Sequence, residues 1–210
     1  MKGGRKLRFQ AISKIHISLF AIVLVVLIWS AIKPFDYADW LAEVSPGVIA
    51  IILLAVTYRK FRFTTLSYFI IAFLCILTFI GGHFTYSEVP LFNWVKDEFD
   101  LKRNNYDRMG HFFKGFAAIV VRELFIRLSP LTKGAWLFVC TTSIILSIAA
   151  LYAIIEWLST KLTKGSKAAK DFLGMQGDKW DAQWDMSLAL AGCLLALLIL
   201  SKWHDRILKK

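Results

Sequence analysis

Five long runs of this sequence contain almost no charged residue, and they constrain the fold more than any other feature. They are residues 17–32, 46–58, 65–82, 134–155 and 187–201. A helix needs about 20 mainly apolar residues to cross the roughly 30 Å hydrocarbon layer of a membrane. Four of the runs reach or approach that length once their flanks are counted. The sequence therefore predicts a protein that crosses a membrane several times.

The remaining run, which is short, and one additional segment bring the predicted crossings to six. The short run at 46–58 is extended outward by "DYADWLAEVS" (36–45), and Pro46 is tolerated near a first helical turn. The stretch "NNYDRMGHFFKGF" (104–116) leads straight into "AAIVV", which predicts a span at 106–128. We predict an all-α fold with one integral membrane domain over residues 1–210, a bundle of about six transmembrane helices. The expected spans are about 15–32, 42–58, 65–82, 106–128, 134–158 and 184–203.

The positive charge of the chain follows membrane topology rather than a nucleic-acid surface. The sequence has 26 Lys and Arg residues against 15 Asp and Glu. With the N-terminus in the cytoplasm, fourteen of the basic residues fall in cytoplasmic segments and nine in outer segments, the bias that the positive-inside rule describes. We predict a cell inner-membrane protein with both termini cytoplasmic, the lipid bilayer as its partner and no nucleic-acid partner. The first apolar run is longer than the ~7–15 residues of a signal-peptide core, so we expect an uncleaved anchor.

Two outer loops and the cysteines have simple interpretations. Residues 84–105 mix aromatic and charged side chains, which predicts a partial amphipathic helix on the membrane surface. Residues 159–180 carry lysines at 161, 164, 167 and 170 along one helical face, either as solvated surface or to attract anionic headgroups. The three cysteines lie inside predicted spans and are expected to be small packing residues.

Ionisable residues from four predicted spans are expected to meet in the outer leaflet. Asp107 and His111 are i, i+4 neighbours, and Lys114 follows on nearly the same helical face. Their counterparts on other spans are His83 at the end of the third, Glu156 near the end of the fifth, and Asp178, Asp181 and Asp185 at i, i+3, i+7 before and within the sixth. Because an ionisable group inside a span costs about 2.5–3.5 kcal/mol, such groups usually face the bundle interior and pair. The sequence predicts a polar cluster open to the periplasm.

A purely structural interpretation explains the same charges. Asp107 and Asp178 can stabilise helix N-termini, and ion pairs can hold four helices together without any chemistry. Arg122, Glu123 and Arg127 lie near the cytoplasmic face, where snorkelling and a Glu123–Arg127 i, i+4 pair account for them.

The functional interpretations differ in what the cluster holds. Histidines and carboxylates suit a divalent metal such as Zn, Mn or Fe(II), which could activate water. The candidate metal ligands are His111, Asp107, Asp181, Asp185 and His83, and the candidate catalytic residues are Asp107, His111, Asp181, Asp185 and Glu156. The expected role is binding or processing an envelope or lipid-headgroup ligand. A small-solute or proton-coupled transporter is the alternative, although six spans without an inverted repeat or Gly/Pro-broken helices do not favour it. A structural or assembly role is the third.

Three motifs carry a resemblance to a known family. "NNYDRMGHFFKG", "YAIIEW" and "GMQGDKWDAQWDM" resemble the YjdF-type family of bacterial inner-membrane proteins, a domain of unknown function, over nearly the whole chain. The order of an Asp/His helix, a Glu helix and a last helix after spaced Asp residues is more loosely similar to VanZ-like membrane proteins, with Arg108 where that pattern has Lys. The resemblance implies the fold and the location and leaves the activity open.

Overall fold

The described part of the chain is entirely helical. The computed structural model describes residues 13–162 and 175–209. They form no strand, and the helices are α1 (Lys14–Ser30), α2 (Tyr37–Thr57), α3 (Thr65–Phe84), η1 (Tyr86–Glu88), α4 (Pro90–Glu98), α5 (Tyr106–Lys114), η2 (Gly115–Ala117), α6 (Ala118–Leu128), α7 (Ala135–Leu162) and α9 (Asp181–Leu208). The lysine face predicted at 161–170 lies mostly outside the described residues.

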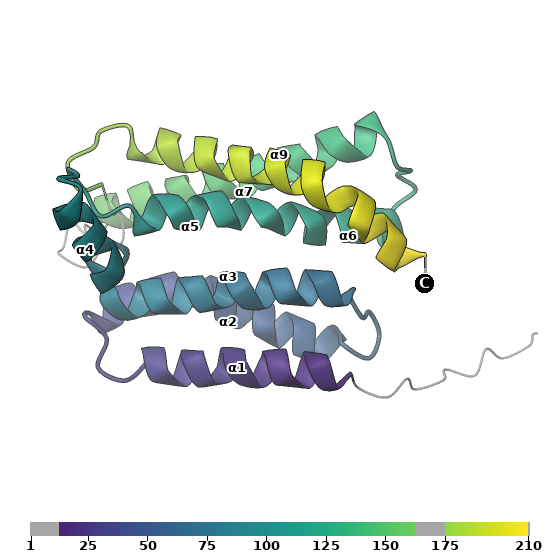
Figure 1. The fold of residues 1–210 in the computed structure, drawn as a ribbon, viewed down its shortest axis with the longest axis horizontal. Coiled ribbons are helices and arrows are strands. Elements are labelled where there is room, and N and C mark those ends of the chain that lie inside the picture. Colours follow the sequence, from purple (N-terminus) through teal and green to yellow (C-terminus); the bar gives the residue numbers. More distant parts are fainter. Residues whose placement is uncertain (1–12, 163–174, 210) are drawn as a thin grey trace, which may run out of the picture.

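The long helices form two groups that lie side by side (Figure 1). α1 and α2 both pack against α3, whereas α5, η2, α6 and α7 pack together around α9. The two groups meet where α3 contacts α5 and α6. The passes along the bundle are α1, α2, α3, the α5–η2–α6 segment, α7 and α9. Both described ends of the chain lie at the same end of the bundle (Figure 1).

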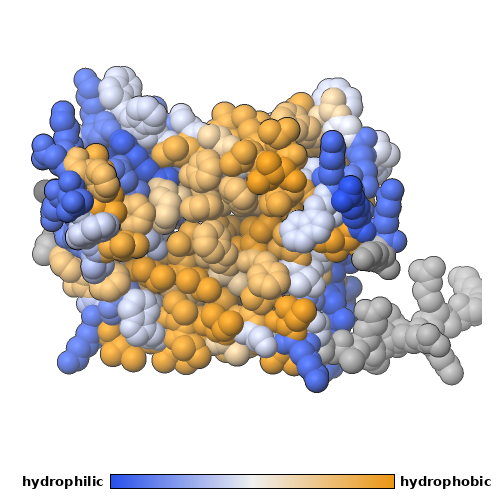
Figure 2. Space-filling view, in the orientation of Figure 1, coloured by the Kyte–Doolittle hydropathy of each residue, from blue (hydrophilic) through white to orange (hydrophobic). Residues whose placement is uncertain are grey.

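The surface matches a membrane-spanning bundle. On the face shown in Figure 2, apolar side chains cover the middle of the molecule and hydrophilic residues gather at both ends. Four helices are long and apolar enough to cross a membrane, namely α2, α3, α7 and α9, and α1 is apolar but has 17 residues. The α5–η2–α6 segment completes the six passes predicted from the sequence.

The fourth predicted span contains a 3₁₀ turn at Gly115–Ala117 between α5 and α6, and the backbone remains helical through it, because Gly115 and Ala118 both have right-handed helical dihedral angles. At this turn two backbones approach closely. A Cβ on Gly115 would lie 2.3 Å from the Ala189 carbonyl oxygen, and a Cβ on Gly192 would lie 1.8 Å from that of Phe112. Only glycine fits at such a crossing, so this pair of glycines sets how tightly α5 packs on α9.

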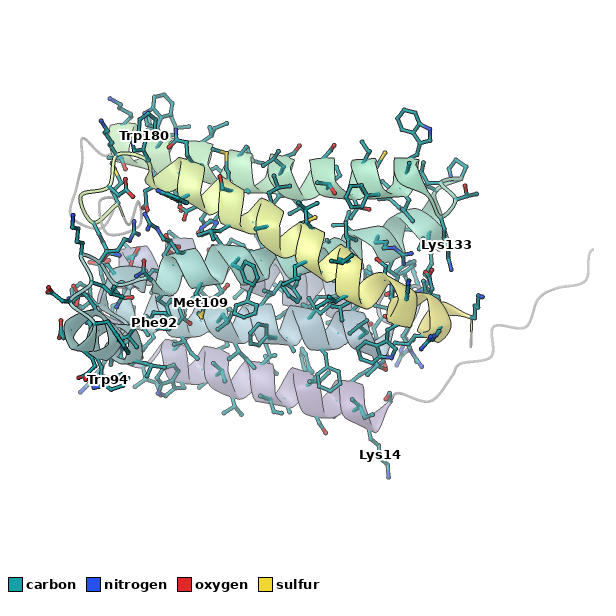
Figure 3. The ribbon with its side chains drawn as sticks, turned by 45° about the horizontal axis from the view of Figure 1, so that its top comes forward. Lys14, Phe92, Trp94, Met109, Lys133 and Trp180 are labelled. Atoms are coloured by element: carbon teal, nitrogen blue, oxygen red, sulfur yellow. The ribbon has the colours of Figure 1, made fainter. Side chains whose placement is uncertain are left out.

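The two ends of the bundle differ in their side chains (Figure 3). Trp94 and Trp180 are exposed at the end that carries α4, which we call the α4 end, and Lys14 and Lys133 lie at the opposite end. The short helix α4 lies across the α4 end (Figure 1), which confirms a helix in the loop at 84–105. Exposed tryptophans are typical of a membrane–water interface.

The cysteines behave as the sequence predicts. All three are free, and Cys75 and Cys193 are buried in the apolar clusters of the two helix groups.

Candidate functional site

One face of α5 carries three ionisable side chains into the bundle. Asp107 and His111 are buried, and the Asp107 Oδ1 lies 3.4 Å from the His111 Nε2. Lys114 Nζ lies 3.2 Å from the same nitrogen. The i, i+4, i+7 spacing creates this row because such residues share a helical face. Just before the helix, the side-chain oxygen of Asn104 accepts the Tyr106 N–H at 3.0 Å.

The last helix brings a second carboxylate to this row. Asp185 on α9 is 5% exposed, and the ligand atoms of Asp107, His111 and Asp185 all lie within 4.8 Å of one another. The tight α5–α9 crossing at Gly115 and Gly192 makes this approach possible. The His111 Nδ1 and the Asp185 Oδ1 are buried and have no hydrogen-bond partner. Buried polar atoms are normally paired, so these two require an explanation.

Two more helices complete the cluster. The Tyr152 hydroxyl on α7 donates a 3.1 Å hydrogen bond to Glu43 Oε2 on α2, and Glu156 lies one turn beyond Tyr152. Glu43 and Glu156 are both buried. The Tyr86 and Tyr152 rings lie 5.3 and 4.7 Å from Lys114 Nζ. We call the set Glu43, Asp107, His111, Lys114, Tyr152, Glu156 and Asp185 the α4-end cluster.

A cavity of about 460 Å³ opens beside this cluster. Glu43, His111, Lys114 and Tyr152 line its polar part, and the rest of its wall is mainly apolar, including Ile71, Leu74, Val120, Val121 and Ile145. Val121 follows Lys114 by seven residues, which places it about 10 Å further along the bundle axis. The cavity therefore joins a charged end to an apolar shaft.

Arginines hold the other two aspartates of the sixth span. The Arg103 guanidinium donates to the buried Asp181 carboxylate, and Arg108 lies 3.9 Å from it. Arg108 also pairs with Asp178, which precedes α9 rather than belonging to its helical stripe. The Trp180 N–H and the Arg108 guanidinium keep the pKa of the Asp178 carboxyl below its ordinary value. These pairs fix the start of α9 and leave Asp185 to the cluster.

His83 lies away from the other candidate ligands. Its Nδ1–H donates to the Ser30 carbonyl oxygen at 3.1 Å, and its ring lies 4.4 Å from that of Trp29. It therefore joins α3 to the end of α1. Of the five candidate metal ligands, the structure brings three together, pairs Asp181 with arginine and places His83 elsewhere.

A second polar cluster lies at the opposite end, where the sequence predicted snorkelling and a Glu123–Arg127 pair. Glu123 and His204 are fully buried, and Arg122 is 7% exposed. The Glu123 carboxylate accepts from the Thr64 N–H and hydroxyl, both at 2.8 Å, and from Ser67 at 2.6 Å, and it pairs with Arg127 at 2.8 Å.

His204 completes this opposite-end cluster. Arg122 donates to its Nδ1 at 3.0 Å, which leaves Nε2–H to donate to Glu123 at 3.3 Å. The predicted Glu123–Arg127 pair is present, but burial rather than snorkelling describes Glu123 and Arg122, because α3 and α9 close over them.

Sequence reasoning missed Glu43, Tyr152 and Arg103. A signal was available for the first two. Asp39 and Glu43 on α2, like Tyr152 and Glu156 on α7, repeat the i, i+4 spacing of Asp107 and His111 at the same end of a predicted span. Arg103 gave no such signal, since it resembles any charge in an outer loop.

The comparisons with known proteins agree with this architecture. A family described as "Predicted membrane protein (DUF2238)" matches residues 15–206. The chain belongs to this family. The inner membrane protein YjdF of Escherichia coli (strain K12) is 40% identical over 190 residues, 88% of each chain. These matches confirm the family resemblance and support a multi-pass inner-membrane location. No solved structure matches the chain significantly.

Proposed function

We propose that this DUF2238 protein binds an amphipathic membrane molecule, with its polar head at the α4-end cluster and its apolar chain in the shaft of the cavity. The cavity carries this proposal, because it joins ionisable groups to apolar walls. From His111 to Val121 it follows ten residues of helix, about 15 Å, or half the roughly 30 Å hydrocarbon thickness. That is the depth of one leaflet, as expected for a lipid-like ligand.

The ligand has a direct route from the bilayer. α2 and α7 both line the cavity, yet α2 packs against α3, whereas α7 packs against α6 and α9. The Tyr152–Glu43 hydrogen bond joins these two helices near the charged end. Pro46, which also lines the cavity, lacks an N–H and weakens α2 one turn below Glu43. Separation of α2 from α7 would admit a lipid sideways.

Charge distribution supports a periplasmic site. The basic residues favour the N-in, C-in orientation, which places the α4 end at the outer leaflet. The ligand is then an envelope or outer-leaflet lipid. Reporter fusions to Lys210 should be active on the cytoplasmic side. A periplasmic Lys210 would place the site at the inner leaflet and contradict the envelope ligand.

The cluster also contains groups that could process a bound head. Asp107, His111, Asp185 and Glu156 are buried carboxylates and an imidazole, the side chains that most often transfer protons in catalysis. A head that enters beside Lys114 would lie within reach of His111, since both side chains line the cavity. We therefore assign Asp107, His111, Asp185 and Glu156 as candidate acid–base groups and Asp181 as the partner of Arg103.

Native mass spectrometry of the full-length protein purified with inner-membrane lipid extract tests the binding proposal. We expect a lipid adduct on the wild type and its loss in Val121→Trp, which fills the shaft. Val139→Trp is the matched control, because Val139 is 48% exposed on α7. An adduct that survives Val121→Trp, or one that the control loses equally, would contradict the proposal.

A cation- or proton-coupled carrier is the second candidate. The 3₁₀ turn between α5 and α6 supports this role, since a 3₁₀ stretch within a helix often marks a functional hinge. Solute-dependent uptake of protons by reconstituted vesicles would support this role, and vesicles that take up neither the solute nor a coupled cation or proton would contradict it.

A further inference from the structure

The α4-end cluster holds more negative than positive groups. Lys114 interacts electrostatically with all four carboxylates of the cluster, those of Glu43, Asp107, Glu156 and Asp185, and the nearby Arg103 also attracts Asp107 and Asp185. Among the described residues, none of these four forms an ion pair with a lysine or arginine, and only Asp107 has a histidine partner. Arg103 and Arg108 are bound to Asp181 and Asp178. A buried carboxylate without a cation is costly, so the cluster is built to receive further positive charge.

The distances among three side chains indicate where a cation would bind. Asp107, His111 and Asp185 each offer one atom within 4.8 Å of the others. Ligands of one Zn²⁺ or similar ion lie about 2.1 Å from it and hence at most about 4.2 Å apart. Small side-chain rotations would close the group onto an ion.

A buried atom of Asp185 independently points to a missing ligand. Its Oδ1 has no hydrogen-bond partner although the residue is only 5% exposed, and the second ring nitrogen of His111, Nδ1, is also buried without a partner. We propose that Asp107, His111 and Asp185 bind one divalent cation of the class that accepts mixed imidazole and carboxylate ligands, such as Zn²⁺ or Mn²⁺. This goes beyond the lipid proposal, and either can fail without the other. His111 lines the cavity, so an open coordination position would face it.

Lys114 is the competitor for this site. Its ammonium lies 3.2 Å from the His111 Nε2, where it takes the place of a cation. The faces of Tyr86 and Tyr152 offer it another position when an ion enters, since both rings lie within cation–π range. Removal of this ammonium should strengthen ion binding. A purely structural ion-pair cluster would show no such gain.

The test is isothermal titration calorimetry of Zn²⁺ and of Mn²⁺ into tag-free, chelator-treated, full-length protein in detergent. We expect about one ion per chain, with affinity lowered at least about tenfold in Asp185→Asn and in His111→Ala and raised in Lys114→Met. His83→Ala is the control, because that histidine contacts α1 instead. All variants are first checked for a single gel-filtration peak.

Two results would overturn the proposal. One is no binding of either ion to the folded wild type. The other is binding that His83→Ala weakens as much as His111→Ala does, since that would show adventitious coordination. Asp185→Asn preserves side-chain shape, so the test stands even where His111→Ala fails to fold.

Discussion

The buried ionisable groups at the two ends of this bundle differ in how fully they are hydrogen-bonded and paired. At the opposite end, Glu123 accepts hydrogen bonds from four residues, Thr64, Ser67, Arg127 and His204, and both ring nitrogens of His204 have partners. At the α4 end, His111 Nδ1 and Asp185 Oδ1 lack hydrogen-bond partners, and the cluster as defined contains four carboxylates and one ammonium, that of Lys114. A fully satisfied network fixes a structure, whereas a partly satisfied one leaves capacity for a ligand. We infer that the opposite-end cluster is structural and the α4-end cluster is functional.

The largest expected loss of stability comes from a substitution in the opposite-end cluster. Glu123→Ala removes the acceptor shared by Thr64, Ser67, Arg127 and His204, so it should cost roughly 3–5 kcal/mol of stability, as loss of one partner of a buried pair does. The measurement is thermal unfolding of the purified protein in detergent. A variant as stable as the wild type would show that this network is dispensable.

A smaller effect is expected where α5 crosses α9. Gly192→Ala places a methyl group against the Phe112 carbonyl and should cost about 1–3 kcal/mol or more by overpacking. Gly110→Ala is the matched control, since its nearest contact would be an ordinary 3.6 Å from the Tyr86 ring. Gly192→Ala should also weaken ion binding at Asp185, because the crossing brings α5 to that carboxylate. Equal melting temperatures for the two variants would contradict the close crossing.

Pairwise coupling should differ between the clusters. A double-mutant cycle on Glu123 and Arg127 should give an interaction of about 1–3 kcal/mol, because the two groups are in direct contact at 2.8 Å. The cycle Asp185→Asn with Lys114→Met should give less than about 0.5 kcal/mol, since Lys114 is shared among four carboxylates and forms no direct ion pair with Asp185. A strong Lys114–Asp185 coupling would favour a structural α4-end cluster.

The smallest loss of stability is expected for Asp178, which precedes α9 at the α4 end. The folded pKa of Asp178 lies below its unfolded value, so its pairing stabilises the protein above the unfolded pKa near ~3.9 and is lost as pH falls through the folded pKa. Asp178→Asn should therefore lower the melting temperature slightly at pH 7 and not at pH values below the folded pKa. Melting curves at several pH values check this, and an equal loss at all pH values would contradict it.

The sequence predicted the fold more fully than the site. Long apolar runs predict the passes because membrane burial depends on composition over many residues. The i, i+4 row of Asp107 and His111 could be predicted from helical spacing, and the depth of Asp185 in the last span placed it at the same end of the bundle. The contact of Gly115 with Gly192 and the closing of α3 and α9 over Glu123 could not, because each depends on how two distant helices pack. The same holds for His83, because its side chain contacts Trp29 and Ser30 of α1 instead of the other candidate ligands.

The most direct test of the central claim is one paired measurement. Asp185→Asn and Glu123→Gln each replace one buried carboxylate by an amide of the same shape, and their melting temperatures can be compared in the same detergent without added metal. We predict that Glu123→Gln melts well below the wild type, while Asp185→Asn melts at or above it. Removal of a buried charge that has no ion-pair partner from a functional site should leave the stability of the folded protein unchanged or raise it. An Asp185→Asn variant that loses as much stability as Glu123→Gln would show that both clusters are structural.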